Sequence, residues 1–231
     1  MKDNKSIIAA ALVAASIIVL GLCLKSGIDN FVDKDRRVEV KGLSEREVEA
    51  NKVTWPIIVR ATGNDLAQLY TQIRAMQQTV KEFLTAGGIL EDDISLCAPD
   101  VNDLDDDYWR DKKPDYRYIV TASVIVVSTD VAKVNDMIDQ KGELLNRGIA
   151  FSEGRTEYTY TSFQEMKPQM MEEAIANAEN TAKQFAKNSH STLNKIVRAD
   201  QGYFSIDDRD DYTPHVKKLR VVTTVVYSLK D

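Results

Sequence analysis

Cysteine and histidine are scarce in this sequence, and their scarcity argues against several kinds of site. The chain has two cysteines and two histidines among 231 residues. Cys23 lies inside an apolar N-terminal run and Cys97 stands alone in the rest of the chain, so they cannot form the disulfide framework of a small secreted domain. We interpret Cys97 as a small, half-buried apolar residue rather than a reactive thiol. So few ligands also argue against a zinc site or a histidine-based triad.

Sequence motifs for catalysis are missing as well. The chain has no nucleophile elbow, no phosphate-binding loop and no dinucleotide fingerprint. His190 lies at the polar end of a predicted helix and His215 follows Pro214 in a predicted turn, so we expect surface residues rather than general bases. We therefore predict a protein that is not an enzyme, with no catalytic residues, no cofactor and no metal ligands.

The sequence also lacks a surplus of positive charge. Its formal net charge is −6. Three lysines against one aspartate give the first 25 residues a charge of +2, so the remaining residues carry −8. An acidic body argues against nucleic acid as a partner, because such binding needs a basic surface that displaces counterions. It also argues against a body that lies flat on anionic lipid.

A long apolar run is present at the N-terminus. Residues 7–24 contain 18 positions without a charge, and at about 1.5 Å per residue a helix of this length spans roughly 27 Å, close to the hydrocarbon thickness of a bilayer. Lys2 and Lys5 precede it. The run predicts an uncleaved membrane anchor, although a cleaved signal peptide and a lipoprotein signal at Cys23 stay open as alternatives.

The anchor hypothesis predicts a location and an orientation. We expect residues 1–25 to form a single-pass anchor in the cytoplasmic (inner) membrane and residues 26–37 to form a polar tether. A short N-terminal tail followed by a large domain favours export of the C-terminal body, residues 38–231, to the periplasm.

Alternating apolar residues predict strands in the first half of the body. We expect a strand at residues 38–40 that Gly42 ends. The strand at residues 53–62 contains Pro56, which predicts an edge strand or a bulge. An amphipathic helix follows Asp65, with Gly87-Gly88 as its stop. Further strands are predicted at these positions: 94–101 and 116–127.

The second half of the body has a similar order of elements. A helix is predicted at residues 130–146, and the later elements are a tyrosine-rich strand at 157–161, a helix at 168–187 and strands at 193–204 and 216–229. We expect the helix at 168–187 to bury Ile175 and Phe185 among others, and the last strand to place Leu219, Val221 and Val225 on one face. Strand, helix, strand, acidic loop and strand therefore occur twice, at about 48–128 and 150–229. We predict an α+β fold of two such repeats, joined by a connecting helix and packed into one two-layer domain. Coincidence of a common element order is the alternative.

Two acidic loops are candidate binding sites. Asp103, Asp105 and Asp107 have the spacing that begins a calcium loop, but Tyr108 and Pro114 stand where such a loop has glycine and glutamate. Internal pairing with nearby basic residues is the other interpretation. The second loop, residues 207–211, contains its own arginine. In the tyrosine-rich strand, Tyr158 and Tyr160 are candidates for stacking on a ligand, with packing or an oligomer interface as the alternative.

Several stretches resemble the SIMPL-domain family of bacterial envelope proteins. The resemblance covers about residues 38–229, and the stretches that carry it are residues 38–42, 87–89, 93–95, 173–178 and 193–196. Details at 42–47 and 202–206 resemble a membrane-anchored subgroup. The resemblance implies an α+β fold, an extracytoplasmic location and, in some members, ring-like or channel-like oligomers. It implies no established enzyme activity and supplies no catalytic residues.

The expected function follows from these observations together. We expect a non-enzymatic, membrane-anchored extracytoplasmic protein that self-associates as an envelope scaffold or a stress-related interaction protein. Contact surfaces are predicted on the strand that contains Pro56 and on the connecting helix, and other envelope proteins are possible partners. The alternative is a binding module for a small ligand or a divalent cation.

Overall fold

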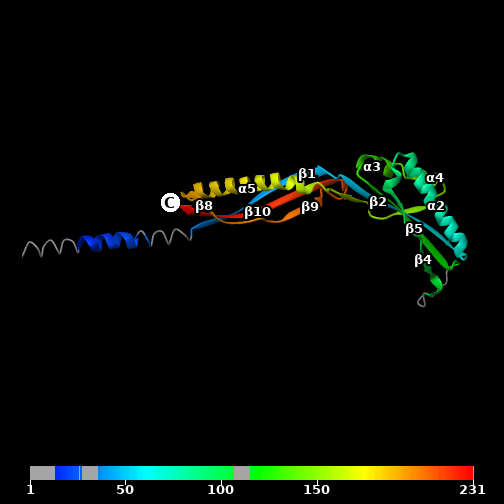
Figure 1. Cartoon of the computed structure of the whole chain (residues 1–231), viewed down its shortest axis with the longest axis horizontal. Coiled ribbons are helices and arrows are strands. Elements are labelled where there is room, and N and C mark those ends of the chain that lie inside the picture. The colour runs from blue at the N-terminus through cyan, green and yellow to red at the C-terminus, as the bar shows by residue number, and fades with distance from the viewer. Residues whose placement is uncertain (1–13, 26, 28–35, 107–114, 231) are drawn as a thin grey trace, which may run out of the picture. The chain divides into compact units, whose positions relative to one another are not determined.

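The computed structural model describes residues 14–25, 27, 36–106 and 115–230. These residues form two compact units (Figure 1). The described residues of unit 1 lie within 1–46, 166–205 and 220–231, and those of unit 2 lie within 47–165 and 206–219. The chain therefore passes from one unit to the other four times. The predicted mixture of helices and strands is confirmed, whereas the symmetric packing of two repeats stays a prediction.

Unit 2 is built on a six-stranded antiparallel sheet. Its central strands pair along their length, from Val53 opposite Ser128 to Gly63 opposite Tyr118. The described strands of this sheet are β2 (Lys52–Gly63), β3 (Ile94–Leu96), β4 (Asp100–Asp103), β5 (Tyr118–Ser128), β6 (Phe151–Glu153) and β7 (Glu157–Thr159). The predicted strand at 94–101 is thus two short strands, β3 and β4. Both pair with β5.

Helices cover the buried face of this sheet. Every second residue of β2, including Trp55 and Ile57, is fully buried against α2 (Leu66–Ala86). The Asp65 side chain accepts hydrogen bonds from two backbone N–H groups of the first turn and so caps α2. Gly88 ends the helix in the left-handed conformation, with φ of 88°. Both helix boundaries therefore agree with the prediction.

The predicted connecting helix at 130–146 is two helices. They are α3 (Val131–Asp139) and α4 (Gly142–Asn146). Val134 and Leu144 anchor them in the core of unit 2, where both side chains are fully buried. Gln140 and Lys141 separate the helices, and a hydrogen bond from Lys141 N–H to Ile138 carbonyl closes a tight turn there. The break allows each short helix to bury its own apolar residue.

Pro56 does not mark an edge strand. β2 pairs with β5 on one side and with β6 and β7 on the other, so the prediction of an edge was wrong. The Pro56 carbonyl accepts a hydrogen bond from Gly154 N–H, 3.1 Å away. Because the nitrogen and carbonyl of one strand residue point to the same side, the proline nitrogen faces the interval between β6 and β7. Its missing N–H therefore removes no bond from the ladder with β5.

Unit 1 contains a four-stranded sheet with a long helix along one face (Figure 1). Its strands are β1 (Arg37–Glu49), β8 (Thr192–Asp200), β9 (Phe204–Asp208) and β10 (Val216–Lys230). The order is β1, β10, β8, and β9 also pairs with β10. The predicted inward face of β10 is confirmed, since Leu219, Val221 and Val225 are buried. The predicted strand at 193–204 is two strands, β8 and β9.

Gly42 does not end the first strand, because β1 continues through it to Glu49. The glycine is instead a point of close approach to α5 (Phe163–Asn188). A Cβ at this position would lie 1.8 Å from the backbone oxygen of Ala174 and 2.8 Å from the Cβ of Ala178. Only a residue without a side chain allows the helix to lie so near the strand.

The buried face of α5 differs from the predicted one. Small residues dominate it, and its buried positions are Met170, Ala174, Ala178, Ala182 and Ala186. Ile175 and Phe185, predicted to be buried, are 41% and 57% exposed. The alanines at four-residue steps allow the close approach at Gly42, and the larger side chains are excluded from that interface for the same reason. α5 also begins five residues before the predicted start at Pro168.

The N-terminal segment is described only in part. Residues 14–25 are helical, and Cys23 in this helix is exposed. Residues 7–13 of the predicted span and residues 26 and 28–35 of the predicted tether lie outside the described residues. Among the residues that the structure covers, no helix is both long and apolar enough to cross a bilayer.

Candidate ligand-binding site

A half-open pocket of about 810 Å³ lies within unit 2. One wall is the segment 155–160, which contains β7, and the other is formed by parts of the segment 206–217. The volume is in the range of small-molecule sites. The residues of the second wall are Ile206, Asp207, Asp208, Asp211, Pro214 and Lys217.

The first wall is held in place by the start of β2. β7 pairs with Lys52, Val53 and Thr54 and with no other described strand, so its second edge is unpaired. Asn51 extends this pairing, because its N–H donates to the Thr159 carbonyl at 3.1 Å. The Asn51 side-chain oxygen accepts from Thr161 N–H at 2.8 Å, which fixes the chain after β7.

Tyr158 is fixed on this wall by two contacts. Its hydroxyl donates a hydrogen bond to the Asn135 Oδ1 at 2.6 Å, and its ring lies edge-on to the His215 ring with centroids 6.1 Å apart. Burial raises the pKa of the Tyr158 hydroxyl, and the nearby Asp139 carboxylate raises it further. The phenol therefore stays neutral at physiological pH. Its ring is partly buried against the core of unit 2 and also lines the pocket.

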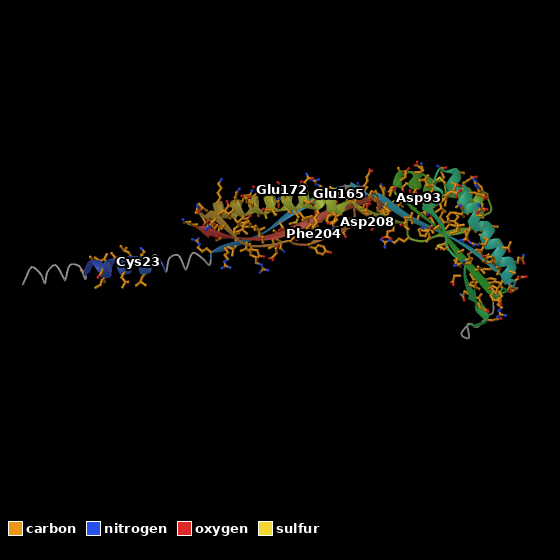
Figure 2. The ribbon with its side chains drawn as sticks, viewed as in Figure 1. Cys23, Asp93, Glu165, Glu172, Phe204 and Asp208 are labelled. Carbon is orange, nitrogen blue, oxygen red and sulfur yellow. The ribbon has the colours of Figure 1, made fainter. Side chains whose placement is uncertain are left out.

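The second wall contains a half-buried ion pair. Lys217 forms a salt bridge with Asp208, which is labelled in Figure 2, and Lys217 is 8% exposed. Lys217 occupies an inward position of β10, two residues before the buried Leu219. Asp208 is the partner that compensates the buried ammonium group. Sequence analysis did not identify this lysine, although a charged residue on an otherwise apolar inward face is the signal that could have identified it.

The turn beside this ion pair is held by Asp210. Its carboxylate accepts hydrogen bonds from the Thr213 hydroxyl at 2.6 Å and from the Arg209 Nε at 3.1 Å. The Thr213 hydroxyl is the main cause, and the Arg209 guanidinium the second, of an Asp210 pKa lowered to about 2. Arg209 also reaches Glu47 at 3.5 Å. The arginine of the second acidic loop is therefore paired with Asp210 inside the loop and with Glu47 outside it.

Three carboxylates of the pocket have no partner of this kind. These residues are Glu157, Asp207 and Asp211. All three are exposed, and their carboxylates make no hydrogen bond or ion pair with another residue that the structure describes. Arg155 is likewise without a described partner. Three negative groups and one positive group give these side chains a charge of −2. The pocket therefore offers unpaired negative charge next to a tyrosine ring.

The first acidic loop is paired where it is described. Arg117 Nη2 lies 2.7 Å from Asp103 and its Nε lies 3.4 Å from Asp105. The hydrogen bond from Arg117 is the main reason that the pKa of Asp103 is lowered. Asp107, Tyr108 and Pro114 lie outside the described residues. Within the described ranges, no group of three or more His, Cys, Asp or Glu residues is arranged to hold a metal ion.

The two histidines and Cys97 have the following surroundings in the structure. The His215 carbonyl accepts a hydrogen bond from Ala50 N–H at 2.8 Å. His190 follows α5 in the left-handed conformation, with φ of 55°. Cys97 is half-buried with a free thiol, and its carbonyl accepts from the Gln77 side chain at 2.9 Å. Neither histidine lines the pocket, although the His215 ring contacts the Tyr158 ring.

Comparison with known proteins identifies a family for this chain. Residues 38–226 match the family model described as SIMPL, a protein of unknown function (DUF541). Among curated proteins, no sequence matches the chain. The match covers almost all of the sequence that follows the apolar N-terminal run and its tether. All of unit 2 and every residue that lines the pocket lie inside it, and unit 1 lies inside it between residues 38 and 226. Because the matched region is most of the chain, this protein belongs to the SIMPL family.

Proposed function

We propose that this protein is a non-enzymatic, membrane-anchored extracytoplasmic protein that binds a small ligand in the unit 2 pocket. The observation that carries the proposal is the pocket itself, about 810 Å³ in volume, with three unpaired carboxylates and Tyr158 in its walls. Small-ligand sites combine such a concave surface with a few polar groups that fix the orientation of the ligand. The unpaired carboxylates of the unit 2 pocket are available for this purpose.

The proposed location rests on the sequence. Residues 7–24 contain no charge, and lysines precede them, which favours a helix that stays in the cytoplasmic membrane with the body in the periplasm. The resemblance to the membrane-anchored subgroup of the SIMPL family supports the same location. A tether at 26–37 would leave the body free to meet soluble ligands.

The binding proposal can be tested by thermal unfolding of the full-length chain in detergent. We expect at least one compound from a panel of charged and neutral small metabolites to raise the melting temperature with a saturating dose dependence. The rise should be reduced in Tyr158→Leu and retained in Tyr158→Phe, because the ring and not the committed hydroxyl faces the ligand. A panel without any saturating stabiliser would contradict the proposal.

Self-association is a second candidate function, and the β1 strand favours it. β1 has 13 residues and pairs only with β10 among the described strands, so one of its edges is unpaired. Such edges pair readily with another copy of the same strand. The Leu43 N–H at this edge donates to the Asn177 side chain at 3.2 Å, so one edge group is already satisfied.

Mass measurement across protein concentrations tests this second candidate. If β1 forms the contact, the detergent-solubilised chain should show a concentration-dependent oligomer that Lys41→Pro weakens. Lys41 lies two residues before Leu43, so its N–H points to the same open edge and its loss leaves the β10 ladder intact. A monomer at every concentration would remove the support for self-association.

A further inference from the structure

We propose that the unit 2 pocket takes an organic dication, a small molecule with two amine or guanidinium groups separated by an apolar spacer. This inference rests on the proposed function, because it names the ligand class for the same pocket. Three features of the pocket support it: the charge of its lining, the two segments that supply its carboxylates, and its apolar side chains.

The charge of the unpaired groups selects a cation. Glu157, Asp207 and Asp211 outnumber Arg155 and leave a charge of −2. The other basic residue of the lining cannot neutralise them, because Lys217 is already paired with Asp208. An anionic ligand would find one free cation and three carboxylates that repel it, whereas a dication would balance the free charge.

The arrangement of the acidic residues favours an extended cation over a metal ion. A hard cation such as Ca²⁺ needs several oxygen ligands that converge to about 2.3–2.6 Å from one point. No three acidic, histidine or cysteine residues in the described part of the chain converge in this way. The pocket carboxylates come from two segments, 155–160 and 206–217. A ligand with two separated positive groups can contact carboxylates of both segments.

The apolar surface of the pocket accounts for the spacer. Tyr158, Ile206 and Pro214 lie among the charged lining residues. Because the Tyr158 hydroxyl is bound to Asn135, the tyrosine offers the ligand its ring. Aromatic faces attract ammonium and guanidinium groups and also pack against methylene chains. Neighbouring carboxylates and a ring are therefore suited to a diamine.

Calorimetry on the full-length chain in detergent, at physiological salt, tests the inference. The probes are 1,4-diaminobutane and spermidine, compared with the neutral isostere 1,4-butanediol, with a monoamine and with Mg²⁺. We expect saturable binding of the two polyamines, weaker binding of the monoamine and none of the diol or Mg²⁺. Asp211→Asn and Asp207→Asn should each weaken polyamine binding by about tenfold, as expected for loss of one charge-assisted contact.

Asp92→Asn is the matched control. Asp92 is an exposed acidic residue of unit 2 outside the pocket lining, and its change alters the net charge by the same amount. It should leave polyamine binding unchanged. Equal losses in Asp92→Asn and Asp211→Asn would overturn the inference, since binding would then follow net charge. Binding of Mg²⁺ with the same sensitivity to Asp211→Asn would overturn it as well.

Failure of the inference is distinguishable from failure of the proposed function. If a neutral or anionic compound binds and Tyr158→Leu weakens its binding, the pocket is a ligand site but its ligand is not a dication. If no compound of any charge binds, the pocket function itself is wrong.

Discussion

Gln77 shows how one polar residue can complete an apolar core. It lies on the buried face of α2 and is 0% exposed, between positions occupied by Ile73 and Val80. Its side-chain amide donates to the carbonyls of Cys97 at 2.9 Å and of Ser123 at 3.1 Å. The Ser123 carbonyl also accepts a hydrogen bond from the Cys97 N–H at 2.9 Å, one residue after β3 ends. The glutamine therefore ties α2 both to the segment that follows β3 and to β5.

Gln77→Leu tests this role. The change keeps the volume but removes the amide donor that the Cys97 and Ser123 carbonyls share, so we expect a loss of about 1–3 kcal/mol in the free energy of unfolding. The measurement is denaturant unfolding followed by circular dichroism. Gln78→Leu, one position along on the exposed face, is the control and should change stability far less. Equal stability of the two variants would show that the amide is not needed.

Asp210 predicts a pH dependence. Its pKa is lowered from 3.8 to about 2 in the folded protein. A carboxyl with a lowered pKa stabilises the fold above its ordinary pKa, and this contribution is lost as the pH falls from about 4 to about 2. We expect the loss of stability across this interval to be smaller in Asp210→Asn than in the wild type. Urea unfolding at pH 6, 4 and 2.5 measures it, and parallel curves would contradict the assignment.

Part of the candidate site could be predicted at the residue level. Tyr158 and the acidic loop at 207–211 drew attention through local composition alone. Their meeting in one pocket could not be predicted, because it depends on pairing between segments about 50 residues apart. The inward position of Lys217 could be predicted from the alternation in β10, but its pairing with Asp208 could not, because that ion pair joins β10 to β9.

At the level of elements, local periodicity gave a sound prediction and isolated residues did not. Alternation in β2, β5 and β10 and the stripe of α2 are repeated signals, so single exceptions do not disturb them. Gly42 and Pro56 were each interpreted as an interruption from their intrinsic preferences. In the structure α5 requires a glycine at one position, and the interval between β6 and β7 tolerates a proline at the other.

Gly42→Ala tests the packing of β1 against α5. The added methyl group would meet the Ala174 carbonyl, so the helix or strand must move, and we expect a cost of about 1–3 kcal/mol in unfolding free energy. Gly142→Ala is the matched control, since an added Cβ there meets no atom within 4 Å. Denaturant unfolding of both variants measures the difference. A neutral Gly42→Ala would show that the interface is looser than described.

At the level of the whole molecule, the anchor proposal predicts a fractionation result. The full chain should remain in the membrane pellet after a carbonate wash, while a chain that begins at residue 26 should be released, because an apolar run of 18 residues holds a protein in the bilayer. Protease added to spheroplasts should degrade the body. A mature N-terminus near residue 26, or a body protected from that protease, would contradict the anchor and its orientation.

The four passages of the chain between its units constrain what can be cut away. Each unit is assembled from segments that are distant in sequence, and the boundaries fall inside β1, α5, β9 and β10 rather than in linkers. No single truncation therefore yields either unit intact, and a nick at one boundary leaves a fragment with pieces of both. Gene fusion or exchange that shuffles contiguous modules must transfer this body as a whole.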